Sequence, residues 1–260
     1  MHFAVALADR APLRPKPMTI NLFVVLTLLS LAACRSIPRH EERSTAGVVR
    51  SDDPAKARRL LELAEEIAPQ VCAQLGVEPA EPFVIHHVPG GDTNGVAVRR
   101  NGARVLERFI LLGKEPEEDY QGFVVAHELV HWYATAPWDR LPHTVEEGLA
   151  DYVSAELAPE LRDHVTTQHD WILSTLTPER RERAFVVDAR DWPKTPKSVR
   201  SDAYSIGFEI CRRLGVHGLR ALCERAERES YSFVPIEWFE IPAKYPAFQR
   251  RLELESFQLD

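Results

Sequence analysis

The chain has 260 residues, of which 45% are hydrophobic and 27% are charged, and its net charge is −7. No internal repeat or low-complexity segment interrupts it. The acidic balance gives no electrostatic basis for binding nucleic acid. We therefore expect one globular domain that does not bind nucleic acid.

The N-terminal segment predicts export. Residues 20–33, INLFVVLTLLSLAA, are apolar, follow basic residues and are too short to span a bilayer comfortably, as in a signal peptide. The run ends in Leu-Ala-Ala-Cys, which resembles the bacterial lipoprotein box and implies a lipid on Cys34. An ordinary cleavage site beside an incidental cysteine is the alternative. We expect a signal peptide over residues 1–33 and a lipid-anchored protein of the cell envelope, facing the periplasm or the cell surface.

The segment after Cys34 is expected to join this anchor to a single domain. Residues 34–51 are charged and lack hydrophobic periodicity, so we interpret them as a tether to a domain over residues 52–260. Proline at position 54 and glycine at position 76 predict the start and end of a first helix. Residues 82–88, PFVIHHV, predict a strand.

The segment VVAHELVHWY, residues 124–133, contains the pattern H-E-x-x-H at His127, Glu128 and His131. Histidines four apart lie on one face of a helix, where both can bind one ion at roughly 2.0–2.1 Å. Glu128 points about 100° away and can take a proton from a bound water. The apolar flanks predict a buried helix, in which unpartnered polar groups cost several kcal/mol. A buried histidine pair satisfied without metal is the alternative.

A catalytic zinc site needs a third protein ligand, and the candidates lie in residues 143–159, HTVEEGLADYVSAELAP. We expect a second helix here, with Thr144 as its cap and Pro159 at its end. The pattern H-E-x-x-H followed by E-G-L-A-D-Y resembles the gluzincins, the zinc peptidases related to thermolysin and to the aminopeptidases. The spacing between the two motifs is slightly shorter here than in the best-known members.

The resemblance implies roles for the acidic residues of the second helix. Glu147, directly before Gly148, would be the third ligand of one Zn²⁺ ion, and Asp151 would hydrogen-bond a ligand histidine. Glu146 is expected to face solvent, because it lies about 100° from Glu147 on the helix. The alternative is that all three carboxylates line an exposed helix face.

The resemblance also implies an α+β, zincin-like fold. A small mixed sheet and the active-site helix would occupy residues 52–135, and a helical subdomain would occupy residues 144–229. Residues 161–176 are expected to be helical, residues 177–197 to form a loop, and residues 201–226 to form two helices broken near Gly215. Cys211 and Cys223 are expected either to bridge adjacent helices or to be small buried groups. Residues 230–260 carry no functional signal.

Two further site assignments follow from the resemblance. Asn101-Gly102 predicts a hairpin, and in gluzincins an edge strand before the zinc helix pairs with the substrate. Here the candidate strand consists of Val96, Ala97, Val98 and Arg99, and an ordinary hairpin is the alternative. The segment after Ser201 is similar to one that follows the site in small gluzincin-like families, so that Tyr204 would stabilise an oxyanion. A packing tyrosine is the alternative.

These patterns together predict zinc-dependent hydrolysis of a peptide or protein substrate at the bacterial cell envelope. His127, His131 and Glu147 would hold the metal, and Glu128 would be the general base. Two alternatives stay open. One is a non-catalytic envelope lipoprotein of the same fold with a binding or assembly role, and the other is a metal-dependent hydrolase of a non-peptide substrate.

The lipoprotein assignment can be tested at one residue. We expect Cys34→Ser to abolish labelling of the protein by a radioactive or clickable fatty acid, because the acyl chains would be attached through this sulfur. Since one acyl chain binds membranes only marginally, stable anchoring requires more than one. Cys72→Ser is the control. A wild-type protein that takes up no label and fractionates away from membranes would contradict the assignment.

Overall fold

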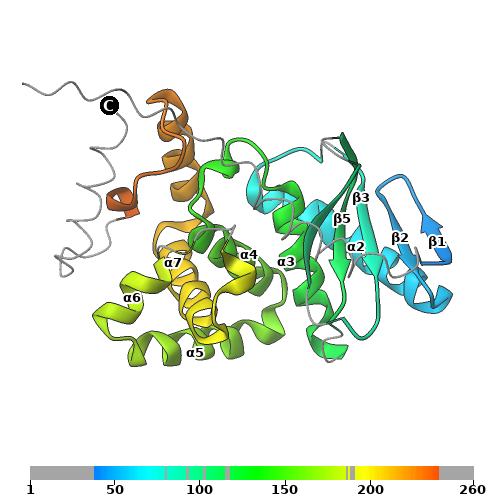
Figure 1. Ribbon diagram of the computed structural model, residues 1–260, viewed down its shortest axis with the longest axis horizontal. Coiled ribbons are helices and arrows are strands. Elements are labelled where there is room, and N and C mark those ends of the chain that lie inside the picture. The colour runs from blue at the N-terminus through cyan, green and yellow to red at the C-terminus, as the bar shows by residue number, and fades with distance from the viewer. Residues whose placement is uncertain are drawn as a thin grey trace, which may run out of the picture. The chain divides into compact units, whose positions relative to one another are not determined.

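The computed structural model describes residues 38–79, 81–91, 94–101, 104–114, 118–185, 187 and 191–239. The predicted signal peptide, Cys34 and the segment from residue 240 lie outside these ranges. The described part is an α+β unit in which a five-stranded mixed sheet is followed by helices (Figure 1). None of its helices is both long enough and apolar enough to cross a lipid bilayer.

The sheet has the strand order β1-β2-β3-β5-β4. The β2–β3 and β3–β5 pairs are parallel, whereas β1–β2 and β4–β5 are antiparallel. The outer strand on the side of the hairpin is therefore β4. The strands are β1 (His40–Arg43), β2 (Gly47–Ser51), β3 (Phe83–His87), β4 (Asn94–Asn101) and β5 (Arg104–Leu112).

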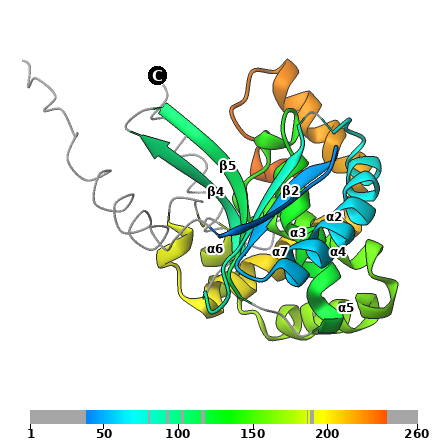
Figure 2. The same cartoon turned by 90° about the vertical axis from the view of Figure 1, so that its right-hand side faces the viewer.

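Helices α2 and α3 lie on the same side of the sheet, and α3 also packs against α4 (Figure 2). Buried aliphatic and aromatic side chains from both layers form one continuous core. Helix α4 then packs along α7, so that α3 lies between the sheet and the C-terminal helices. The helices are α2 (Pro54–Leu75), α3 (Gln121–Tyr133), α4 (His143–Leu157), α5 (Pro159–Thr175), α6 (Pro178–Phe185) and α7 (Lys197–Arg228).

Several local predictions are confirmed. The side chain of Asp53 caps the first turn of α2, and Gly76 ends it with φ 64°. The antiparallel pairing of β4 with β5 confirms the hairpin around Asn101. Helix α7 is broken at Gly215, whose φ of 64° and ψ of 167° are not helical.

The predicted tether over residues 34–51 is wrong from residue 40 onward, because β1 and β2 belong to the sheet. Residues 47–51 alternate between buried and half-buried, as expected for a strand whose successive side chains point to opposite faces of a sheet. The charged residues that suggested a tether form ion pairs within and across the sheet instead. Arg50 of β2 contacts Glu41 of β1 and Glu107 of β5.

Two further expectations need correction, and one open alternative is settled. Residues 177–197 are not only a loop, since they contain α6, whose Arg180 forms a paired contact with the buried Asp202. Thr144 does not cap α4, because the helix begins one residue earlier and the Thr144 hydroxyl donates to the carbonyl of Ala184 at the end of α6. Of the two alternatives for Cys211 and Cys223, the second is confirmed, because both are buried free thiols and no disulfide joins them.

Helices α4 and α7 approach each other at Gly148 and Gly207. A Cβ on Gly148 would lie within 3.0 Å of the Gly207 backbone, and a Cβ on Gly207 would lie within 3.0 Å of the carbonyl oxygen of Thr144. Only glycine fits at either position without moving a helix. Since Glu147 precedes Gly148, this contact sets the position of Glu147 relative to α7.

We expect Gly207→Ala to destabilise the protein by about 1–3 kcal/mol, the usual cost of overpacking. The control is Gly122→Ala in α3, where an added Cβ meets nothing within 4 Å. It should be neutral or stabilising by up to about 1 kcal/mol, because alanine favours helix over glycine. Denaturant unfolding measures both. Equal stability of the two variants would show that the packing of α4 on α7 tolerates a methyl group here.

Candidate metal centre

The site begins with the two histidines of α3. His127 and His131 are one helical turn apart, and their Nε2 atoms lie 3.2 Å from each other. Both rings are half-buried, and Glu128 between them is buried. The H-E-x-x-H helix predicted from the sequence is therefore present, and its two imidazoles point at one place.

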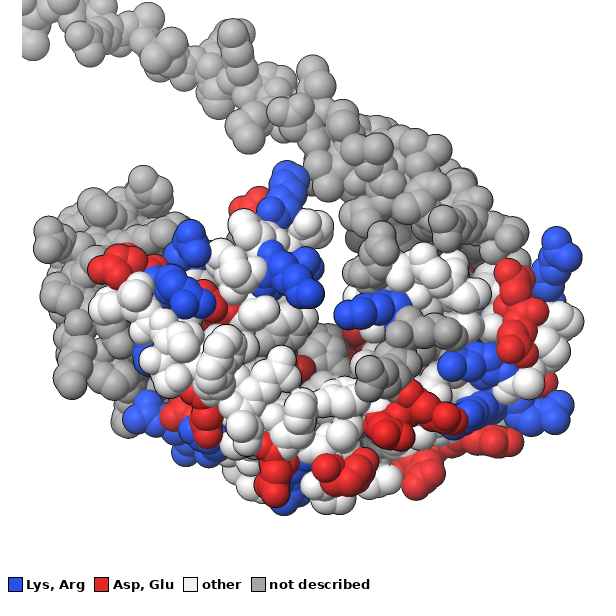
Figure 3. All heavy atoms as spheres, turned by 90° about the horizontal axis from the view of Figure 1, so that it is seen from below, with Lys and Arg blue, Asp and Glu red and all other residues white. Residues whose placement is uncertain are grey.

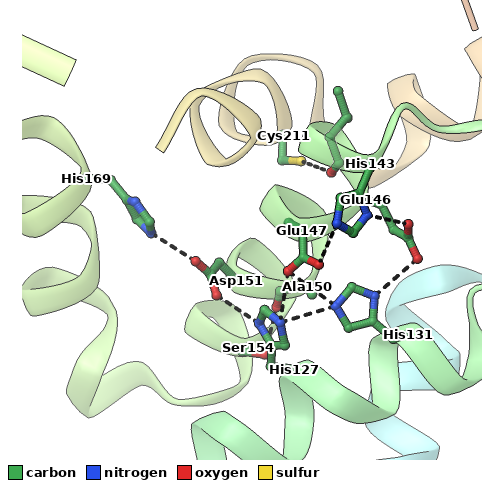
Figure 4. A network of polar contacts seen from close by, with 11 residues as sticks. His127, His131, His143, Glu146, Glu147, Ala150, Asp151, Ser154, His169 and Cys211 are labelled. Atoms are coloured by element: carbon green, nitrogen blue, oxygen red, sulfur yellow. Dashed lines mark hydrogen bonds and ion pairs between the residues drawn. The ribbon is translucent and has the colours of Figure 1, made fainter. Parts of the chain in front are cut away.

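Helix α4 brings Glu147 to the same place. Its Oε2 lies 3.5 Å from Nε2 of His127 and 3.6 Å from Nε2 of His131 (Figure 4). Among the described residues these three side chains are the group of histidine, cysteine and acidic residues that could hold a metal ion. Two imidazole nitrogens and one carboxylate oxygen suit a divalent transition metal.

Glu128 is set for a different role. Its Oε2 is buried and has no hydrogen-bond partner in the described part of the chain. Burial raises the pKa of this carboxyl, and the neighbouring histidines oppose the shift without cancelling it. A buried carboxylate oxygen without a partner is costly, so this atom is expected to contact a ligand or a water molecule.

Each histidine has a carboxylate behind it. Nδ1 of His127 lies 2.8 Å from Oδ1 of Asp151, whose Oδ2 lies 3.4 Å from Nε2 of His169 on α5. Nδ1 of His131 lies 3.2 Å from Oε1 of Glu146. Such partners fix the tautomer and the orientation of a ligand histidine.

The expectation that Glu146 faces solvent is therefore wrong. Although its side chain is 34% exposed, both of its oxygens contact histidines, since Oε2 lies 3.4 Å from Nδ1 of His143. Helical phase directs Glu146 away from the group of His127, His131 and Glu147, but the second nitrogen of His131 faces Glu146. His143 and His169 carried no signal in the sequence, because a single histidine has no spacing that marks its role.

The charges of the site are balanced among its own groups. Burial alone would lower the pKa of His127, but hydrogen bonds with Asp151 and Glu147 raise it to about 10. Burial alone would raise the pKa of Glu147, yet His131 and His127 hold it well below its usual range. A bound cation would replace the histidine protons in this balance, because ligand histidines must be neutral.

Tyr204 of α7 lies beside His127, which with His131 and Glu147 forms the metal group. Its ring centroid is 6.0 Å from that of His127 and 5.4 Å from that of Trp192, which lies in η3 (Trp192–Lys194). Burial and then the carboxylates of Glu147 and Asp151 raise the pKa of Tyr204. Its hydroxyl therefore keeps its proton and can donate a hydrogen bond.

The candidate substrate strand lies at the edge of the sheet. Val96, Ala97, Val98 and Arg99 form part of β4, the outer strand of the sheet, and β4 packs against α3. Among the described side chains, none of the polar contacts around His127, His131 and Glu147 involves Val96, Ala97 or Val98; the side chain of Arg99 lies outside the described part. Their position is compatible with pairing to an extended ligand, but they are not brought together with the metal group.

Comparison with known proteins leaves the family of the chain open. No protein-family model matches it, and no curated protein matches it either. The resemblance to gluzincins therefore rests on the motif of α3, on the segment from Glu147 to Asp151, and on the way the fold brings the two together.

We expect Glu147→Ala to weaken metal binding, with Zn²⁺ as the probe ion, by more than the roughly 10–100-fold that loss of an outer-shell partner costs. The variant removes one of three protein donors, and two histidines alone do not complete the set of three protein ligands. A competition titration against a coloured chelator measures the affinity. The control is Glu62→Ala, an exposed glutamate of α2. Wild-type affinity in the Glu147 variant would remove this residue from the ligand set.

Proposed function

We propose that the protein is a zincin-like, zinc-dependent peptide hydrolase of the bacterial cell envelope. The observation that carries the proposal is the buried Oε2 of Glu128, which has no partner within the described residues and lies on the helix that supplies both histidines. A site that only held a metal for stability would gain nothing from this carboxylate. A site that activates water requires it.

The spacing of the donor atoms supports zinc. In a tetrahedral site with bonds of about 2.05 Å, neighbouring donor atoms lie about 3.3 Å apart, whereas an octahedral site with the same bonds places them about 2.9 Å apart. The three separations here are 3.2, 3.5 and 3.6 Å. Three protein ligands also leave the fourth position open, as in catalytic zinc sites.

The residues of the chain then divide the work of hydrolysis. When bound, zinc lowers the pKa of a water molecule and polarises a carbonyl oxygen. Glu128 accepts the proton of that water and later delivers it to the leaving amine. Tyr204 donates a hydrogen bond to the oxygen that becomes negatively charged, unless its ring only packs against His127 and Trp192.

Strand β4 supports a peptide as the substrate. Val96 and Val98 pair with Ile110 and Arg108 of β5, and these partners face α3, since Arg108 donates to the carbonyls at the end of that helix. An extended peptide could add to the outer edge of β4 through main-chain hydrogen bonds. Val98 is 42% exposed and would contact the side chains of that peptide.

The cellular location in this proposal rests on residues 1–34, which the structure does not describe. The proposal includes no nucleic-acid partner. On the face shown in Figure 3, basic and acidic side chains are interspersed and do not gather into one basic area. This pattern, with the net charge of −7, gives little attraction for phosphate backbones.

We expect Glu128→Gln to retain the metal and to lose at least about 100-fold in turnover, the usual contribution of a general base. Glutamine has nearly the same shape but cannot accept the proton. Cleavage of a peptide library, followed by mass spectrometry with and without chelator, measures the activity. Glu62→Gln is the control, and a metal-loaded Glu128→Gln variant with normal turnover would contradict the mechanism.

The same variant separates the proposal from its two alternatives. A metal-loaded but inactive protein should retain peptides that the wild type cleaves, so they can be recovered and identified. Capture of non-peptide compounds alone would favour a hydrolase of another substrate class. A wild type that binds metal but neither cleaves nor captures any compound would favour the non-catalytic lipoprotein.

A further inference from the structure

The imidazole of His131 is held from both sides by consecutive residues of α4. Its Nδ1 lies 3.2 Å from Oε1 of Glu146, and its Nε2 lies 3.6 Å from Oε2 of Glu147. Consecutive helical residues point about 100° apart, so they would not normally reach the same group. They do so here because His131 presents its two nitrogens in different directions (Figure 4).

His143 lies behind both of these carboxylates. It is the first residue of α4, three residues before Glu146 and four before Glu147, and so lies on the same side of the helix as both. Its Nδ1 lies 3.4 Å from Oε2 of Glu146. Its Nε2 is buried, has no hydrogen-bond partner among the described residues, and has Oε1 of Glu147 3.3 Å away.

The position of the His143 ring is fixed by packing. The ring meets the indole of Trp192 edge-on, with 4.6 Å between their centroids. Trp192 comes from η3, a segment remote in sequence from α4, and it also contacts Tyr204. The ring is therefore held by a second part of the chain while both of its nitrogens face carboxylates.

The two oxygens of Glu147 consequently have different neighbours. Oε2 is the atom close to both ligand histidines, whereas Oε1 faces His143. Because the contact of Oε1 with the His143 imidazole keeps that oxygen away from the ligand histidines, we expect Glu147 to bind a metal through Oε2 alone. Binding through one oxygen keeps the coordination number low and leaves a position for water.

We propose that His143 and Glu146 form one positioning unit of the metal site, in which Glu146 orients His131 and His143 restricts Glu147 to binding through Oε2. This proposal rests on the metal-binding part of the proposed function and is independent of peptide hydrolysis. It differs from the role of Asp151, which is half-buried between two histidines and orients only one ligand histidine, His127.

Zinc titration of single variants tests the unit. We expect Glu146→Ala and His143→Phe each to weaken zinc binding about 10–100-fold, as loss of outer-shell partners does. Phenylalanine keeps the packing on Trp192 and removes only the nitrogens. Glu146→Gln should recover part of the loss, because its amide oxygen can still accept from His131. Glu156→Ala is the matched control, since Glu156 lies on α4, is also 34% exposed and pairs with Arg162 instead of a histidine.

Two further measurements separate positioning from general stability. The visible spectrum of the cobalt-substituted protein reports coordination geometry, and we expect His143→Phe to shift it while Glu156→Ala does not. The double variant Glu146→Ala with His143→Phe should lose less affinity than the two single losses multiplied, because residues of one unit are not additive.

Three results would overturn the proposal. The first is zinc affinity and a cobalt spectrum in Glu146→Ala and His143→Phe that match those of Glu156→Ala. The second is a drop in unfolding stability with no change in either metal readout, which would make the two residues structural. The third is a wild-type protein that binds neither ion, which would refute the metal centre itself. Loss of peptide cleavage alone would count against the proposed hydrolysis and not against this proposal.

Discussion

The close approach of α4 and α7 at Gly148 and Gly207 is the contact on which the site depends. Backbone meets backbone there, so the distance between the helices is fixed by main-chain atoms and not by adaptable side chains. Two other contacts hold the first turn of α4, from the Thr144 hydroxyl to α6 and from the Cys211 thiol to the carbonyl of Val145. All three involve segments far from the motif in sequence.

This packing matters because α4 supplies four of the polar groups of the candidate metal centre. These four, His143, Glu146, Glu147 and Asp151, lie within nine consecutive residues of one helix. A site built on a rigid helix keeps its geometry better than one built on loops. Their charges also offset one another, since the histidines lower the pKa of Glu146 to about 2 against the effect of burial. Glu128 differs from Glu146, because its buried Oε2 has no hydrogen-bond partner among the described residues.

The parts of the site that follow from fixed spacings could be predicted from the sequence. His127 and His131 are four positions apart, as are Glu147 and Asp151, and side chains at this spacing meet on one face of a helix. The hairpin and both ends of α2 follow from equally local rules. Strands β1 and β2 could not be predicted, because their short alternation is hidden among charged residues whose partners lie on other strands. Helix α6, similarly, gains its stability from Asp202 of α7.

The roles of Glu146 and His143 show why helical phase alone does not assign a site. Phase states in which direction a side chain leaves the helix, but not what the neighbouring helix presents there. The imidazole of His131 is a two-sided group, so a residue that points away from the metal can still bind the ligand's outer nitrogen. Two adjacent glutamates after an H-E-x-x-H helix are therefore more informative than one. The first can orient a ligand and the second can be a ligand, provided that the two helices cross as α3 and α4 do here.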